Sequence, residues 1–103
     1  MTQPGRARIL IVDDEEGVLE GLQRHLQALF DLTLVSDQQE ALKLVVSQGP
    51  YAVAVSDLRM PGMDGVALLC SIRSLAPDTV RVLLTGFGDL EAAMAAINEG
   101  NIF

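Results

Sequence analysis

Four short apolar runs, rich in β-branched residues, recur along the chain with segments of helical periodicity between them. The runs occupy residues 8–13 (RILIVD), 32–36 (LTLVS), 52–57 (AVAVSD) and 80–85 (VRVLLT). They are almost continuously apolar and do not alternate, which is typical of strands in a parallel sheet covered by helices on both faces. The pattern therefore predicts an α/β fold with right-handed crossovers.

The first two intervening segments carry clear helix signals. In the first, Glu15 and Glu16 favour the opening turn, because acidic side chains stabilise the positive end of a helix dipole. Behind them, apolar residues follow a single helical stripe: Val18, Leu19, Leu22, Leu26 and Leu29. The second helix is predicted to begin at a cap formed by Ser36 with Gln39, and to end at Gly49-Pro50.

The later segments repeat the alternation and then stop within a unit. A third helix is predicted at about 64–75 and a fourth, rich in alanine, at 89–100. Ile102 and Phe103 have the character of a fifth strand that opens and is not continued. We therefore expect a loose N-terminal tail over residues 1–7, and one domain over residues 8–103 that is incomplete at its C-terminus.

Composition narrows the class of protein. The chain has 103 residues, half of them apolar, so it is long enough for one small domain with a core. With 14 acidic and 7 basic residues the net charge is -7, and the basic residues form no patch, so we expect no direct nucleic-acid binding. The first apolar run is too short for a signal peptide or a membrane span, which favours a cytoplasmic protein.

A single cysteine and a single histidine exclude an internal disulfide and a zinc-ligand cluster. Cys70 and the methionines are expected to serve packing, and His25 to face solvent from the polar side of the first helix. Any metal would therefore be held by oxygen ligands.

Acidic residues stand where two of the predicted strands end. Asp13 and Asp14 follow the first strand, and Asp57 follows the third. In an open parallel sheet, ligands bind at the carboxyl ends of the strands, where the strand order reverses. If the strand order is 2-1-3-4, the three acids converge.

Converging carboxylates need a proton or a cation between them, because two of them about 4 Å apart repel by roughly 4 kcal/mol at an effective dielectric near 20. Mg²⁺ fits an open site with one or two carboxylates, waters and a phosphate oxygen. Taken singly, Asp57 also fits a turn residue and Asp13-Asp14 a helix cap. Their joint occurrence, with the Pro61 turn at a fixed offset, favours a reactive site.

These segments resemble the receiver domain of two-component response regulators. The matching elements are ILIVDDEE, VSDLRMPGMDG and LLTG, and the resemblance covers residues 8–103. It implies a flavodoxin-like, doubly wound parallel sheet with strand order 2-1-3-4(-5), whose fifth strand and last helix are missing or incomplete here.

The resemblance also implies a role for each matching residue. Asp57 would be the phosphoacceptor, and Asp13, Asp14, Asp57 and the backbone carbonyl of Arg59 would hold Mg²⁺ or Mn²⁺. Thr85 would hydrogen-bond the phosphoryl group and start a conformational switch. The partner would be a sensor histidine kinase or a phosphotransfer protein, and the chain would catalyse only its own phosphorylation and dephosphorylation.

Further positions follow from the same resemblance. Pro61 and Gly65 would shape the loop beneath the site. Arg59 and Phe87 occupy positions that govern water access to the acyl phosphate in this family, although surface exposure explains them equally well. Gly86 stands where the family usually carries alanine.

The family's lysine at the end of the fifth strand has no counterpart in the chain. The fourth strand is then expected to be an exposed edge that could pair with a second copy in a homodimer. The segment TGFGDLEAAMAAINEG is similar to receivers joined to HD-type phosphodiesterases or transcription activators, so we expect an effector domain on the full-length chain.

Three alternative classes can be compared with this interpretation. A receiver-like assembly module that is not phosphorylated remains open, and the missing lysine favours it. A phosphatase with an aspartate nucleophile would carry Asp-x-Asp after the first strand, where this chain has Asp13-Asp14. A flavin-binding protein of similar topology would need a hydroxyl-rich phosphate loop at that place and aromatic residues for stacking.

Overall fold

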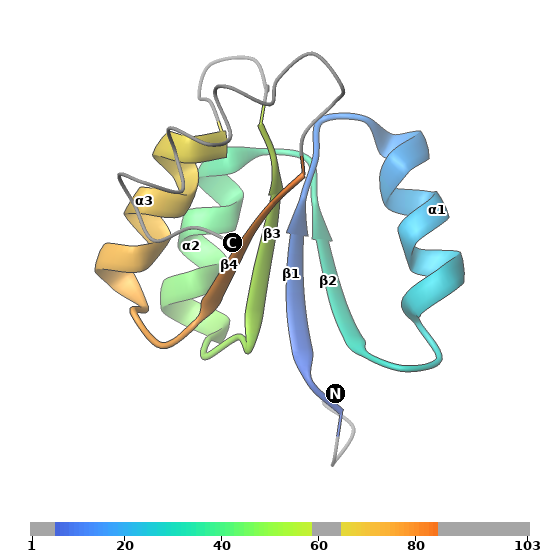
Figure 1. Cartoon of the computed structure of the whole chain (residues 1–103), viewed down its shortest axis with the longest axis horizontal. Helices are drawn as coiled ribbons and strands as arrows, with labels where there is room; N and C mark the ends of the chain where they lie inside the picture. Colours follow the sequence, from blue (N-terminus) through green and yellow to red (C-terminus); the bar gives the residue numbers. More distant parts are fainter. Residues whose placement is uncertain (1–5, 59–64, 85–103) are drawn as a thin grey trace.

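Parallel β-strands form the middle layer of the computed structural model, which describes residues 6–58 and 65–84 (Figure 1). The strands are β1 (Arg8–Val12), β2 (Asp31–Val35), β3 (Val53–Asp57) and β4 (Val80–Leu84). Within the described residues they pair in the order β2-β1-β3-β4, all parallel. The expected strand order is confirmed, and each strand lies within one residue of its predicted bounds.

Helices cover both faces of this sheet (Figure 1). They are α1 (Glu16–Leu26), α2 (Gln38–Gln48) and α3 (Gly65–Leu75). Helix α1 lies on one face, and α2 and α3 lie together on the other. The arrangement is the doubly wound, flavodoxin-like fold that the sequence and the resemblance predict.

Two apolar layers hold the helices to the sheet. The layer beneath α2 and α3 contains Leu10, Val12, Ala54, Leu68 and Ile72, none of them more than 1% exposed. The layer beneath α1 is smaller and is built around three buried residues, which are Ile9, Ile11 and Leu19. Alternate residues of β1 enter opposite layers, which explains why that strand is apolar without interruption.

The first helix is shorter than its apolar stripe predicts. It ends at Leu26, and the amides of Leu29 and Phe30 donate to the Leu26 carbonyl oxygen in a closing turn. Leu29 is 65% exposed and Val18 is 37% exposed, so these two members of the stripe do not enter the core. Phe30 packs there instead, because the turn after α1 directs its ring back toward the sheet.

The predicted cap of the second helix was wrong by one residue. The side chain of Asp37, not that of Ser36, accepts a hydrogen bond, and the donor is the amide of Glu40 at 2.9 Å. An N-cap needs extended backbone immediately before the first helical residue, and Asp37 has φ -129° and ψ 130°. The helix ends at Gln48, before the predicted Gly49-Pro50 stop.

Replacing Asp37 with alanine is expected to lower the free energy of unfolding by about 1 kcal/mol, because the first turn of α2 loses its side-chain acceptor. Urea unfolding followed by circular dichroism measures this change. Ser36→Ala is the matched control, and its free energy of unfolding should stay close to that of the parent. A larger loss in Ser36→Ala than in Asp37→Ala would restore the cap that the sequence predicted.

Several other predictions meet the structure at single residues. Cys70 is exposed on α3, so its expected packing role is wrong. His25 is exposed, as predicted, with Nδ1 3.0 Å from the Gly21 carbonyl oxygen. Of the expected tail, Arg6 donates to the Gln27 carbonyl and Ala7 accepts from the Asp31 amide. The predicted fourth helix and fifth strand lie outside the described residues.

Candidate functional site

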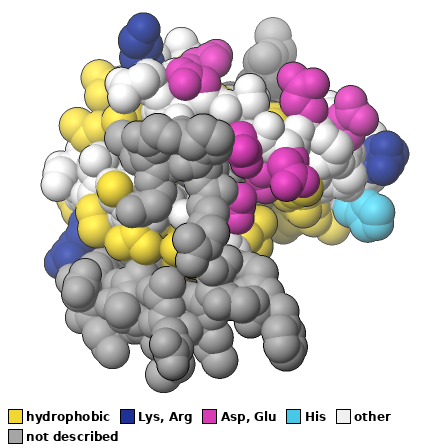
Figure 2. All heavy atoms as spheres, turned by 90° about the horizontal axis from the view of Figure 1, so that it is seen from above, with side chains coloured by type: hydrophobic (Ala, Val, Ile, Leu, Met, Phe, Trp, Pro, Cys, Tyr) yellow, Lys and Arg dark blue, Asp and Glu magenta, His cyan; other side chains and the backbone are white. Residues whose placement is uncertain are grey.

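Asp13, Asp14 and Asp57 meet at the carboxyl edge of the sheet. One carboxylate oxygen from each lies within 4.8 Å of the other two. Asp13 and Asp14 follow β1, and Asp57 is the last residue of β3, the neighbouring strand. The convergence that the strand order predicts is therefore present. Figure 2 looks down on this edge and shows acidic side chains gathered there and continuing toward α1.

The three carboxylates differ in their access to water. Asp13 is 5% exposed, Asp57 is half-buried and Asp14 is exposed. Burial raises the pKa of the Asp13 carboxyl, and a hydrogen bond from the Glu15 amide at 2.9 Å opposes that rise. The neighbouring charges of Asp57 and then Asp14 raise the pKa further. The site is thus a pocket of negative charge that opens to solvent at Asp14.

The helix-capping interpretation of the acidic pair is partly realised as well. Asp13 Oδ1 accepts from the amide of Glu15, the residue that directly precedes α1. This bond fixes the turn between β1 and α1 and holds one face of the Asp13 carboxylate. Asp13 therefore has a structural contact and a place in the acidic cluster, and the two do not exclude one another.

The oxygen set fits a small divalent cation. Oxygens that bind one Mg²⁺ at about 2.1 Å lie at most about 4.2 Å apart, so a small side-chain rotation would bring the cluster to that spacing. Carboxylate oxygens are the donors that Mg²⁺ prefers, and the exposed side of Asp14 leaves room for water or a phosphate oxygen. Among the described residues, this is the one acidic group with that geometry.

The backbone beside Asp57 is packed tightly. Gly65, the first residue of α3, donates its amide hydrogen to the Leu58 carbonyl oxygen at 2.7 Å. A Cβ atom on Gly65 would overlap the Asp57 carbonyl oxygen and lie 2.8 Å from the carbonyl carbon. The absence of a side chain at Gly65 is therefore what allows α3 to start against the end of β3.

Other predicted site residues lie outside the part of the chain that the structure describes. They are Arg59, Pro61, Thr85, Gly86 and Phe87. Their roles remain predictions. Sequence reasoning did not find the contribution of Ser56, whose side chain is fully buried and donates to the Asp57 carbonyl oxygen at 2.9 Å. A polar residue inside an otherwise apolar strand was the available signal.

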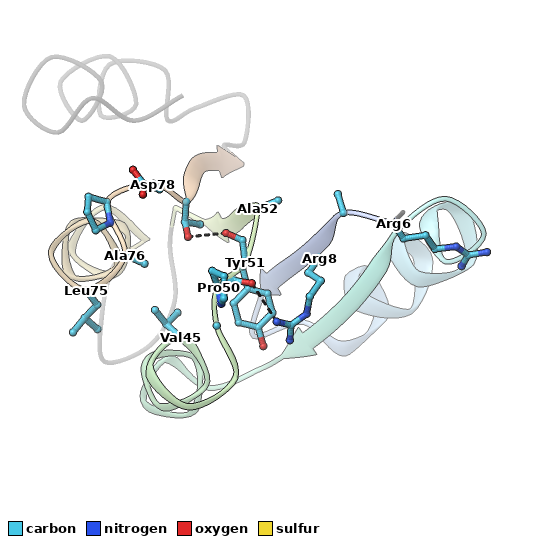
Figure 3. Close-up of a pocket in the computed structure, with 13 residues that line it drawn as sticks. Arg6, Arg8, Val45, Pro50, Tyr51, Ala52, Leu75, Ala76 and Asp78 are labelled. Atoms are coloured by element: carbon cyan, nitrogen blue, oxygen red, sulfur yellow. Dashed lines mark hydrogen bonds between the residues drawn. The ribbon is translucent and has the colours of Figure 1, made fainter. Parts of the chain in front are cut away.

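A larger cavity, of about 750 Å³, lies at the opposite, amino edge of the sheet (Figure 3). Its polar groups already serve internal contacts. Arg8 stacks 4.6 Å from the centre of the Tyr51 ring and donates to the carbonyl oxygens of Gln48 and Pro50 at 2.6 and 3.2 Å. Thr79 Oγ1 donates to the Tyr51 carbonyl at 2.7 Å. The cavity therefore lacks the convergent polar groups of a specific ligand site.

Comparison with known proteins identifies the class. A sequence model of the response regulator receiver domain matches residues 9–102. The signal receiver domain of an HD domain-containing protein from Pseudomonas fluorescens superposes with a TM-score of 0.85 at 38% identity, covering 95% of this chain and 78% of that one. A Rhodopirellula baltica structure described as an adenylate cyclase gives a TM-score of 0.90 at 40% identity, covering 95% and 73%.

Curated relatives agree with that class. The hydrogenase transcriptional regulatory protein HoxA of Cupriavidus necator is 38% identical over 95% of this chain, and the transcriptional regulator NtrC of Escherichia coli is 36% identical over 92%. The match covers 20% of the length of either relative. The chain belongs to the response regulator receiver domain family of two-component signalling. No helix in the described ranges is long and apolar enough to cross a membrane.

Proposed function

We propose that this chain is a phosphoacceptor receiver that takes a phosphoryl group onto Asp57 in a reaction dependent on Mg²⁺ or Mn²⁺. The observation that carries the proposal is the convergence of Asp13, Asp14 and Asp57 at the carboxyl edge of the sheet. Family membership supports the same role. No external metabolite would be turned over, because the chain would act only on its own aspartyl phosphate.

The proposed chemistry is a transfer between two side chains. A carboxylate oxygen of Asp57 attacks the phosphorus of a phosphohistidine on a histidine kinase or phosphotransfer protein. The new O–P bond forms as the P–N bond breaks, and the imidazole leaves with its electron pair and takes up a proton. The product is an acyl phosphate on Asp57, the half-buried member of the cluster.

Each remaining part of the proposal assigns a residue to a task. Asp13, Asp14, Asp57 and the Arg59 carbonyl would hold the divalent ion, which supplies charge neutralisation at the phosphoryl oxygens. Asp13 would contribute a carboxylate already oriented by the Glu15 amide. Thr85 would accept the role of phosphoryl hydrogen-bond donor and switch residue.

The downstream partner is also part of the proposal. HoxA and NtrC are named as transcriptional regulators, and this chain matches one fifth of each. We infer that the full-length protein joins the receiver to an effector domain, with a cytoplasmic location. A homodimer through the edge of β4 is a further part of the proposal, supported by Val80 and Leu84, which are 46% and 38% exposed.

Incubation with acetyl phosphate and Mg²⁺ tests the central claim. The intact mass of the chain is expected to increase by one phosphoryl group, and the adduct should not form when EDTA replaces Mg²⁺. Asp57→Asn should abolish the increase, because the nucleophilic oxygen is lost. Asp78→Asn, which removes an exposed carboxylate from the α3–β4 turn, is the matched control and should be labelled like the parent.

The opposite results have clear meanings. Equal labelling of Asp57→Asn and the parent would place the phosphoryl group elsewhere. A parent chain that gains no mass, and shows no spectral change with beryllofluoride and Mg²⁺, would contradict the phosphoacceptor proposal. That outcome would favour the alternative function, a receiver-like assembly module that is not phosphorylated.

A further inference from the structure

We propose that Ser56 is a positioning residue, whose buried hydroxyl fixes the main chain of Asp57 so that its carboxylate points into the acidic cluster. The inference rests on the proposed function, because it assigns a second residue to the same site. Ser56 Oγ donates to the Asp57 carbonyl oxygen at 2.9 Å, and Ser56 is 0% exposed.

The location of Ser56 makes a polar side chain costly unless it has a purpose. It lies in register with Val12 on β1 and Leu83 on β4, and both of these belong to the apolar layer beneath α2 and α3. Ala54, two residues earlier on the same face of β3, is apolar and 1% exposed. A buried hydroxyl is tolerated only when it is hydrogen-bonded, and here its acceptor is the backbone of Asp57.

Asp57 needs this support because it lies at the end of the sheet pairing. The register between β1 and β3 ends at Val12 and Ser56, one residue before Asp57. On the other side, Asp57 is still in register with Leu84 of β4. The ladder therefore holds the residue from one side only, on the strand edge that faces away from Asp13 and Asp14.

Two contacts converge on the Asp57 carbonyl group. The Ser56 hydroxyl binds its oxygen, and the Cα of Gly65 approaches it so closely that a Cβ atom could not be accommodated. Together they set the orientation of the peptide that follows Asp57. Since the carboxylate and this carbonyl group branch from the same Cα, fixing the carbonyl restricts where the carboxylate can lie.

The binding of Mn²⁺ to the folded chain tests the proposal, with the free ion measured by electron paramagnetic resonance. Ser56→Ala is expected to raise the Kd for Mn²⁺ by about tenfold, the lower end of the effect of removing an outer hydrogen bond that orients a metal ligand. Ser56→Cys retains a weak donor, so it should show a smaller loss in the same direction. It also provides a second variant if Ser56→Ala folds poorly.

Ser71→Ala is the matched control, because it removes a serine hydroxyl that donates to a carbonyl oxygen, that of Ala67, on α3 away from the cluster. Its Kd for Mn²⁺ should equal that of the parent. Urea unfolding of every variant separates stability from positioning, since a purely structural serine would change the free energy of unfolding and leave the Kd unchanged.

Two negative results overturn the proposal in different ways. If the parent binds Mn²⁺ and Ser56→Ala binds it equally well, the positioning role is wrong and the proposed metal site stands. If the parent itself does not bind Mn²⁺, the metal site of the proposed function is wrong, and the positioning role is wrong with it.

Discussion

Replacing Gly65 with alanine is expected to lower the free energy of unfolding by about 3 kcal/mol, at the upper end of the usual cost of overpacking. The added Cβ would overlap the Asp57 carbonyl oxygen and lie 2.8 Å from the Asp57 carbonyl carbon and 3.0 Å from Leu58 Cα. All three atoms are backbone, so a side-chain rotation cannot relieve the contact. Urea unfolding followed by circular dichroism measures the loss.

Two other glycines provide matched controls for this substitution. Gly17 and Gly21 lie in α1, and a Cβ atom at either position would meet no other atom within 4 Å. Alanine there should raise the free energy of unfolding by roughly 0.5–1 kcal/mol, because glycine in a helix interior loses more backbone entropy on folding. A Gly65→Ala variant as stable as the parent would contradict the tight packing of α3 against β3.

Gly65→Ala should also disturb the acidic cluster. If α3 moves away to make room for the new methyl group, the end of β3 that carries Asp57 moves with it. We therefore expect weaker Mn²⁺ binding in Gly65→Ala than in either control variant. Unchanged Mn²⁺ binding in a destabilised Gly65→Ala chain would show that the strain is absorbed in the helix alone.

Neutralising Asp13 is expected to stabilise the chain when no divalent ion is present. At pH 7 in EDTA, Asp13→Asn should raise the free energy of unfolding by between about 1 and 4 kcal/mol, the repulsion of two carboxylates about 4 Å apart in media between water and a protein surface. Asparagine keeps an oxygen that can accept from the Glu15 amide, so the turn before α1 is retained. Thermal or urea unfolding measures the gain.

The gain should depend on pH in a defined direction. The pKa of Asp13 in the folded chain is raised above its ordinary value of 3.8, so the folded state binds more protons than the unfolded state above that pH. The contribution of Asp13 to stability is then fully present below pH 3.8 and is lost as the pH rises through the folded pKa. The advantage of Asp13→Asn should accordingly be small near pH 4 and complete at pH 7.

Added Mg²⁺ should reverse the order of the two proteins. A ligand at 100 times its Kd stabilises a folded chain by about 2.7 kcal/mol, and Asp13→Asn would bind the ion more weakly than the parent. Asp78→Asn is the control, with an expected change within about 0.5 kcal/mol in EDTA or in Mg²⁺. A destabilised Asp13→Asn chain in EDTA at pH 7 would show that repulsion does not govern this cluster.

The sequence by itself determined the strands, their parallel arrangement and the meeting of three acids. Each of these depends on short-range pattern: runs of β-branched residues select strands, and the carboxyl ends of neighbouring parallel strands lie at one edge. Asp13, Asp14 and Asp57 each follow such a run. Their convergence needed only the strand order, which the family resemblance supplied.

The tertiary structure alone decided which side chains are buried and which atoms touch. Leu29 has the spacing of a core residue and is 65% exposed, because the chain leaves α1 one turn earlier. Ser56 has the chemistry of a surface residue and is 0% exposed, because its neighbours in register close over it. Burial and close contact depend on segments far apart in the chain, so local pattern does not encode them.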